Sequence, residues 1–353
     1  MKKAFRLIGI VLGAVAALLV LVVLAVTVAE YRPADEEPVT LAGSGAQSAA
    51  PGQTLTVLSW NIGYGGLSET ADFFMDGGSG VRSQDKDSVS ANIDAVTDLI
   101  GQTDADVVFL QEADRNSTRS WHIDETQRIA AASPAYQTAF AGNFKVLYMP
   151  YPIPFYGHID SGIFTLTKFT ADSARRVQLP CPFSWPVRTL NLKRCLLVER
   201  IPVDGSDKEL VLINLHLEAY DSGEGKIAQT KMLAELMQAE LDKGNYVIAG
   251  GDFNQSFSSV DTSMYPLQGG GLWECGEIDV TEFSDGWQFL MDTAHPTCRS
   301  LDRAYDRSDP GFQFYMIDGF VVSPNIKVET METLDLDFVH SDHNPIAMTV
   351  TLG

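Results

Sequence analysis

The sequence predicts an α/β or α+β sandwich, preceded by one transmembrane helix. Three observations predict this fold class: an apolar N-terminal run, many short β-rich runs, and two segments whose apolar residues recur at helical spacing. Strands mixed with helices are typical of a sheet core with helices packed outside it. The 353 residues are 45% apolar, which is enough for a large buried core.

The N-terminus predicts a membrane anchor. Residues 7–29 form an apolar run without a charged side chain, and a basic segment, residues 1–6, precedes it. A helix needs roughly 20 apolar residues to span a bilayer. The basic residues favour a cytoplasmic N-terminus, so the chain after Glu30 should lie outside the cytoplasm, at the cell membrane. A cleaved signal peptide is the alternative, because Thr27-Val28-Ala29 resembles a small-residue cleavage site.

The remainder divides into a linker and one large domain. Residues 30–52 are rich in Pro, Ala, Gly, Ser and acidic residues and lack apolar periodicity, which predicts a flexible linker. No internal repeat or long Pro/Gly-rich break follows, so residues 53–353 are expected to form a single catalytic domain, which we expect to be a monomer.

Regular elements can be placed within this domain. Helices are expected at residues 89–100 and 226–241. Strands are expected at residues 54–60, 107–111, 161–167, 195–201, 210–215, 246–250, 316–323 and 346–352.

Charge and cysteines limit the function classes. The formal charge of -21 gives no broad basic surface for nucleic acid, so a phosphate-bearing substrate must meet a local positive charge. The same acidity could serve solubility alone. Two disulfides would be consistent with export; the shortest loops pair Cys181 with Cys195 and Cys275 with Cys298, and four free thiols are the alternative.

Polar residues stand where the expected strands end, which is where an α/β sheet binds ligands. They are Asn61, Glu112 after Gln111, His216, Asp252 and Asn254 within Gly-Asp-Phe-Asn, Asp318, and Asp342 with His343.

This set has a coherent chemistry. Mg²⁺ prefers oxygen ligands, a role open to Glu112 with Asn61 or Asp342. A histidine beside a carboxylate, as in Asp342-His343, can take the proton of an attacking water. Asp252 and Asn254, two apart on a turn, could both face one cavity, and His216 could donate a hydrogen bond to a phosphate oxygen.

The motifs Trp-Asn, Gln-Glu, Asn-Leu-His-Leu, Gly-Gly-Asp-Phe-Asn, Ile-Asp-Gly-Phe and Ser-Asp-His-Asn-Pro resemble, in order, those of the endonuclease/exonuclease/phosphatase superfamily. The resemblance covers residues 55–350. It implies a deoxyribonuclease-I-like fold, a four-layered sandwich of two central, mainly antiparallel sheets flanked by helices. It also implies a hydrolase of phosphoric esters that depends on Mg²⁺, with Mn²⁺ or Ca²⁺ as alternatives.

Roles carry over by position. The resemblance makes Glu112 the principal metal ligand, assisted by Asn61 and Asp342. His216 and Asn254 would contact the scissile phosphate, Asp252 would position or activate water, and Asp318 would orient His343, which acts as base or as transition-state stabiliser. The family's tyrosine or arginine between the Glu and His motifs has no clear counterpart, so Arg115 and Arg119, just after Glu112, are our candidate phosphate-side cations.

The substrate is open at this point. The anchor and the aromatic, proline-rich segment 144–156 favour a lipid head group or another small phosphoester near the membrane, although that segment could equally be core packing. An extracytoplasmic nuclease acting on DNA or RNA is the first alternative. An inactive binding scaffold is the second.

Overall fold

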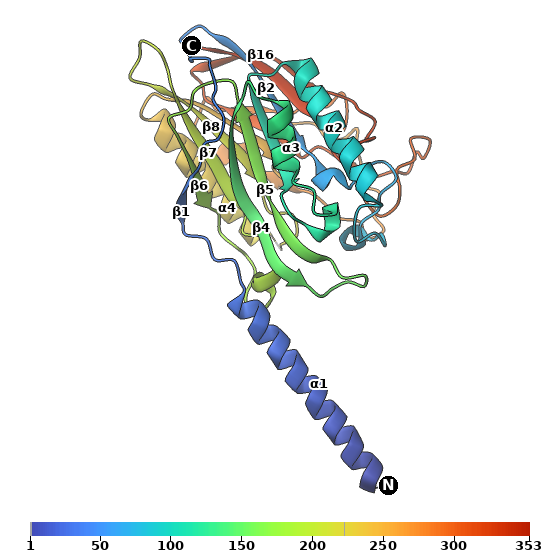
Figure 1. Cartoon of the computed structure of the whole chain (residues 1–353). Helices are drawn as coiled ribbons and strands as arrows, with labels where there is room; N and C mark the ends of the chain where they lie inside the picture. Colours follow the sequence, from blue (N-terminus) through green and yellow to red (C-terminus); the bar gives the residue numbers. More distant parts are fainter. Residues whose placement is uncertain (1, 222) are drawn as a thin grey trace.

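The computed structural model describes residues 2–221 and 223–353 and confirms the two-sheet sandwich with helices outside (Figure 1). The helices are α1 (Lys2–Val28), α2 (Lys86–Thr103), α3 (Glu125–Ala132) and α4 (Glu224–Leu241). The main strands are β1 (Glu36–Val39), β2 (Thr54–Asn61), β3 (Val107–Asp114), β4 (Gln137–Met149), β5 (Gly157–Thr167), β6 (Ser173–Gln178), β7 (Cys195–Pro202), β8 (Glu209–His216), β9 (Tyr246–Asp252), β12 (Gln288–Leu290), β15 (Asp318–Val322), β16 (Ile326–Thr333) and β17 (Ile346–Leu352).

Two mixed sheets form the centre of the domain. One has the order β1-β6-β7-β8-β9-β15-β12 and the other β16-β17-β2-β3-β5-β4. The neighbours β2 and β3 are parallel, as are β8 and β9, and the other pairs within these sheets are antiparallel. All eight expected strands are present. β4 was not expected, although it pairs with β5 along most of its length.

Apolar side chains join the layers. Between the sheets, Val107 and Phe109 of β3 pack in one buried cluster with Leu212 of β8 and Ile248 of β9. The outer face of the larger sheet is covered by α4 and the outer face of the smaller sheet by α2, as Figure 1 shows. Burial of each fully enclosed Leu, Ile or Phe contributes roughly 1.5–3 kcal/mol, so these contacts fix the sandwich.

A buried polar contact also joins the two sheets. Gln111 of β3 donates from Nε2 to Asn214 Oδ1 of β8 at 2.9 Å, and Asn214 Nδ2 donates to the backbone oxygens of Leu110 and Phe164 at 3.2 Å. Both amides are fully buried. Because a buried amide is costly unless it is hydrogen-bonded, this contact holds the sheets in one relative position.

The segment expected to be a flexible linker packs along the domain. Residues Glu36–Val39 form β1 and pair antiparallel with β6, and single bridges join Ala42 to Thr138 and Gln47 to Phe169. An edge strand is held by backbone hydrogen bonds and needs no apolar periodicity, which is why the composition did not predict it. The four cysteines are free in the structure, so neither disulfide is present.

α1 projects away from the domain (Figure 1), and none of its described residues is buried. It is long and apolar enough to cross a membrane, and could be an anchor or a signal sequence. Its end is held against the domain, because the Trp185 indole donates to Thr27 Oγ1 at 2.9 Å.

Replacing Asn214 by Ala should lower the free energy of unfolding by about 2–3 kcal/mol, because Gln111 and two backbone carbonyls lose their partner inside the core. Urea denaturation followed by fluorescence measures this change. The exposed Asn116→Ala should change stability by less than about 0.5 kcal/mol. Equal effects of the two substitutions would contradict the inter-sheet role.

Candidate active site

Strand register places three of the expected residues in a row. In the larger sheet His216 of β8 lies opposite Asp252 of β9, and Asp252 lies opposite Asp318 of β15. β8 and β9 run parallel and end here, whereas the antiparallel β15 begins here. All three side chains therefore lie at one sheet edge, and all are buried.

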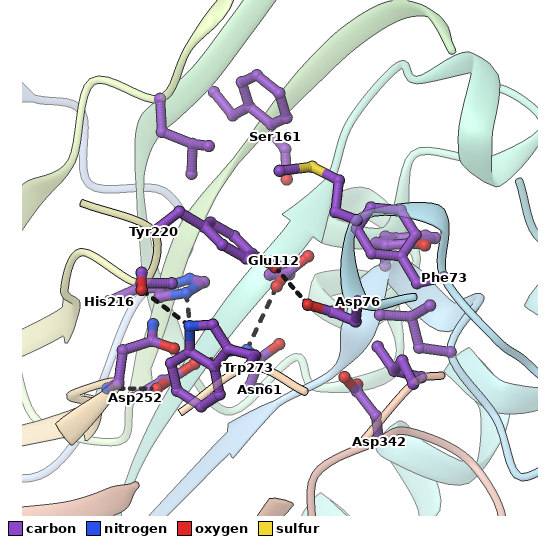
Figure 2. Close-up of a pocket in the computed structure, with 18 of the residues that line it drawn as sticks. Asn61, Phe73, Asp76, Glu112, Ser161, His216, Tyr220, Asp252, Trp273 and Asp342 are labelled. Atoms are coloured by element: carbon purple, nitrogen blue, oxygen red, sulfur yellow. Dashed lines mark hydrogen bonds and ion pairs between the residues drawn. The ribbon is translucent and has the colours of Figure 1, made fainter. Parts of the chain in front are cut away.

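The smaller sheet supplies the residues on the opposite side. Asn61 ends β2 and pairs in register with Gln111, the residue before Glu112. A register shift interrupts the pairing of β3 with β5 between Leu110 and Ala113, and Glu112 adopts φ 56° within it. Non-glycine residues held in such strained conformations concentrate at functional sites. The bulge turns Glu112 out of the sheet and into the cavity (Figure 2).

His343 lies in the loop before β17 and is fixed by two hydrogen bonds. Its Nδ1 lies 2.8 Å from Asp318 Oδ2, and its backbone oxygen accepts from the Trp60 indole at 2.8 Å. Burial, the largest single cause, would lower the pKa of His343, but the charges of Asp318, Cys298 and Asp342 and the hydrogen bond to Asp318 together raise the pKa well above the ordinary value. These neighbours favour the protonated imidazole.

Asp252 is the centre of the cluster. Its Oδ2 accepts from Asn61 Nδ2 at 3.0 Å and lies 3.3 Å from His216 Nε2 and 3.8 Å from His343 Nε2. Burial and the neighbouring Asp318 charge raise the pKa of Asp252 to about 7. A carboxyl with this pKa can accept a proton near neutral pH.

His216 and Asn254 complete the row. Burial, followed by the charges of Arg194 and His343, holds the pKa of His216 well below its ordinary value, so this imidazole is neutral. Its buried Nδ1 has no partner among the described residues. Asn254 adopts φ 52°, and its backbone N–H donates to Asp252 Oδ1 at 2.8 Å. Both residues line the cavity.

The site could hold a metal ion. Asp252, Asp318 and His343 are buried and bring ligand atoms within 4.8 Å of one another, and Cys298, Asp342 and His343 form a second such group. These sets differ from the expected one, but Glu112, Asn61 and Asp342 line the same cavity. The oxygen-rich donor set fits a hard divalent cation.

Asn61 has an orientation that its sequence position did not indicate. Its Oδ1 accepts from the backbone N–H of Gly63 at 3.1 Å, and Nδ2 faces the carboxylates of Glu112 at 3.4 Å and Asp252 at 3.0 Å. In this orientation Asn61 aligns the two acids by donating to them, and coordination by its oxygen would require the amide to turn.

The two candidate phosphate-side cations have different positions. Arg119 lies in the cavity wall, but its guanidinium makes a two-pronged contact to Asp114 and lies 3.5 Å from Glu112 Oε2. Arg115 is not among the cavity-lining residues and stacks on Phe140 at 3.7 Å. The structure therefore does not place Arg115 at the site.

Sequence reasoning missed another cation, Arg194, just before β7. Its side chain is buried and lines the cavity, and its Nε lies 3.9 Å from Glu218 Oε2 without a hydrogen-bond partner among the described residues. It lies in the chain between Glu112 and His216, the interval in which the family's tyrosine or arginine was sought. Its neighbour Cys195 begins an expected strand, and a basic residue entering a strand was the available signal.

Asp76 and Tyr220 were also missed. The Tyr220 hydroxyl donates to Asp76 Oδ1 at 3.2 Å, as Figure 2 shows. Burial and the charges of Asp342 and Glu112 raise the pKa of Asp76 to about 7. Asp76 ends the short 3-10 helix η2 (Phe74–Asp76) and Tyr220 lies in a loop, and neither belongs to a motif, so no local signal pointed to them. The cavity that all these residues line has a volume of about 690 Å³.

Fold and site together define a hydrolase of phosphoester bonds. The model of the Endonuclease/Exonuclease/phosphatase family matches residues 58–343, and the chain belongs to this family. No curated protein sequence matches the chain.

Solved structures show the same fold at low identity. An endonuclease/exonuclease/phosphatase from Beutenbergia cavernae is 18% identical with a TM-score of 0.58, over 85% of this chain and 72% of that one. TDP2 of D. rerio, complexed with a single-strand DNA product, is 14% identical with a TM-score of 0.53, over 85% and 99%. ANGEL2, a 2',3'-cyclic phosphatase, is 15% identical with a TM-score of 0.54, over 89% and 98%.

Replacing Asp318 by Asn should lower the pKa of His343, because the charge and the hydrogen bond of Asp318, which oppose the effect of burial, are lost. In the unchanged chain the folded-state pKa exceeds the unfolded one. The pair therefore stabilises the fold fully below about pH 6.5, and this contribution is lost as pH rises through the folded pKa.

NMR titration of the imidazole protons in EDTA-treated protein measures the change in the pKa of His343. The His343→Gln variant assigns its resonance. The matched control is Asp335→Asn, which removes the exposed partner of His295 and should leave His343 unchanged. A His343 that stays protonated in Asp318→Asn would mean that other groups hold its proton.

Proposed function

We propose that this protein is a metal-dependent hydrolase of phosphodiesters or phosphomonoesters, anchored by α1 and acting outside the cytoplasm near the membrane. The observation that carries the proposal is the convergence of Glu112, His216, Asp252 and His343 on a single cavity, with Asp318 bonded to His343 behind the cavity wall. They come from separate strands and loops of both sheets. No requirement of folding alone would bring the buried carboxylates of Asp252 and Asp318 and the half-buried Glu112 together, because their charges repel.

The pKa values of Asp252 and His343, both raised, support one proton acceptor and one proton-bearing group at the reacting phosphate. Asp252, with its pKa raised to about 7, positions water and accepts its proton as the water oxygen attacks phosphorus. His343 carries a proton already, held by Asp318, so it donates a hydrogen bond to the phosphoryl group and stabilises the charge that develops there. The bond from phosphorus to the leaving oxygen breaks, and that oxygen takes up a proton.

Neighbouring groups bind the phosphate. The neutral His216 and the side chain of Asn254 line the cavity and would contact the scissile phosphate. Arg194 adds the local positive charge that a chain of net charge -21 requires for an anionic substrate. Arg119 forms ion pairs with Glu112 and Asp114, so we assign it a structural role.

Glu112 is the proposed principal metal ligand, with Asp342 beside it and Asn61 aligning Glu112 through its amide. A bound Mg²⁺, or Mn²⁺ or Ca²⁺ in its place, would neutralise phosphoryl charge and polarise the phosphorus–oxygen bond. The Asp252, Asp318 and His343 group is a second place at which an ion could bind.

The domain division proposed is a basic cytoplasmic segment 1–6, an anchor 7–29, a connection 30–52 and a catalytic domain 53–353. The charge of -21 disfavours a nuclease, although TDP2 in its DNA complex has this fold. Nicking of supercoiled plasmid would support the nuclease alternative. Failure on plasmid, phospholipids and small phosphoesters alike would support the inactive scaffold.

Replacing Asp252 by Asn should lower kcat by about 10²–10⁴-fold, because the amide cannot accept the proton of water. The full chain in detergent is assayed with Mg²⁺ on a soluble phosphodiester and on a phosphomonoester. Asp261→Asn, an exposed position, is the control and should keep full activity. A folded Asp252→Asn enzyme with unchanged kcat would remove Asp252 from the chemistry.

Replacing Glu112 by Gln should weaken Mg²⁺ binding by at least about 10–100-fold, the loss typical of residues that merely orient a metal ligand. Mg²⁺ titration by calorimetry and by activity after EDTA treatment measures both effects. The exposed Glu224→Gln serves as control. If both variants bind Mg²⁺ as tightly as the unchanged chain, the ion lies elsewhere, and the Asp252, Asp318 and His343 group is then tested.

A further inference from the structure

The cavity has an apolar side opposite its catalytic end. Its lining includes Leu67, Phe73, Phe144, Met149 and Leu190, which carry no group that could contact a phosphate. A volume of about 690 Å³ falls within the range of roughly 300–1,000 Å³ typical of small-molecule sites. A phosphate with only a small polar head group would leave this apolar side in contact with water.

Large apolar side chains are exposed around one opening of the cavity. We call them the apolar rim, and they belong to the end of β4, to the loop between β4 and β5, and to the segment just before and at the start of η4 (Val187–Leu190). The rim consists of Leu147, Tyr148, Tyr151, Ile153, Phe155, Trp185 and Val187, which are 41–85% exposed. A concentration of this kind on a soluble surface marks a binding face. Trp and Tyr are the residues enriched at membrane–water interfaces.

The burial of its residues decides between the two interpretations of segment 144–156, a lipid-facing segment and core packing. Phe144, Val146 and Tyr156 are buried in one apolar cluster on which Met149 also packs, whereas the rim residues between Val146 and Tyr156 are exposed. The ends of the segment are thus core, and its middle is surface.

The rim adjoins the end of α1. Trp185 bonds to Thr27 in the last turn of that helix. Immediately beyond it, the buried side chain of Glu30 lies 3.3 Å from both Arg188 and Lys193. Figure 1 shows the β4–β5 loop at the same end of the domain from which α1 leaves. If α1 spans the bilayer, these contacts bring the rim to the membrane surface.

Two residues belong both to the apolar rim and to the cavity lining. Tyr151 and Val187 are exposed rim residues and also line the cavity. The Tyr151 ring packs edge-on against Phe74 of the cavity wall, with centroids 6.2 Å apart. The cavity therefore opens into the rim, and an apolar chain could enter it from there along a continuous apolar surface.

We propose that the apolar rim lies in the membrane interface and that the substrate is a phosphoester lipid of that same membrane, with a hydrocarbon chain in the apolar side of the cavity. Its phosphate lies at Arg194, His216 and Asp252. Water replaces one ester oxygen at phosphorus by the hydrolysis described above, and no other reactant is needed. This inference rests on the proposed hydrolase function and narrows its substrate class.

The test uses the full chain, with Mg²⁺, in liposomes of phosphatidylcholine containing anionic phospholipid, and in parallel a soluble phosphodiester without a hydrocarbon chain. The double variant Leu147→Asp/Ile153→Asp changes rim residues that do not line the cavity. Its turnover of liposomal lipid should fall at least about tenfold per lost apolar contact, while turnover of the soluble ester stays unchanged. Met264→Asp, equally exposed but outside the rim, should change neither.

A second measurement does not depend on activity. In liposomes whose lipids carry brominated acyl chains, the added tryptophan of Ile153→Trp should be quenched, and that of Met264→Trp should not. Quenching at position 153 together with selective loss of lipid turnover supports the proposal.

The outcomes separate the two claims. Hydrolysis of the soluble ester without hydrolysis of liposomal lipid, or with a double variant that retains lipid turnover, overturns the lipid inference and leaves the hydrolase proposal standing. An unquenched tryptophan at position 153 also overturns it. If folded, Mg²⁺-bound protein hydrolyses neither substrate, the hydrolase proposal fails and the lipid inference fails with it.

Discussion

The hydrogen bond between Gln111 and Asn214 sets the position on which the site depends. It joins β3 of one sheet to β8 of the other inside the core, at 2.9 Å. Glu112 follows Gln111, and His216 lies two residues beyond Asn214. A sandwich held by apolar contacts alone can slide, because such contacts are non-directional. The amide pair removes that freedom, so groups from two independent sheets reach one cavity in fixed register.

The carboxylates among those groups repel one another, and their negative charges are compensated to different degrees. Asp318 faces the His343 imidazole, and Glu112 lies near Arg119, but the groups within 3.3 Å of the Asp252 carboxylate carry no full positive charge: the amide of Asn61, the backbone N–H of Asn254 and the neutral His216. The uncompensated charge appears as the raised pKa of Asp252, and the same burial that raises this pKa would suit the carboxylate to the proposed role of base. A metal ion bound near Glu112 would reduce the remaining repulsion between the carboxylates, so ion binding would be coupled to their protonation.

The sequence predicted the strands and the residues at their ends because both leave local signals: β-branched runs, then polar motifs. It could not predict contacts made between distant segments. β1 has no apolar alternation, and its pairing with β6 is visible only in three dimensions. Arg194 and Asp76 reach the cavity from segments without a motif, whereas Arg115, chosen for its nearness to Glu112 in sequence, lies on Phe140. Neighbours along a strand alternate between faces, so proximity in sequence was the wrong guide.

The connection between α1 and the domain restricts the orientation of the domain more than its composition indicates. A free tether of some twenty residues would let the domain rotate, and any face could meet the membrane in turn. Here Thr27 contacts Trp185, Glu30 is buried between Arg188 and Lys193, and β1 extends the sheet, so the domain has one orientation relative to the helix. In that orientation the β4–β5 loop, which carries part of the rim, lies at the end of the domain from which α1 leaves (Figure 1). Orientation, rather than mere proximity, would then let a lipid move from the bilayer into the cavity without exposing its chain to water, a step that would otherwise cost about 0.8 kcal/mol per methylene.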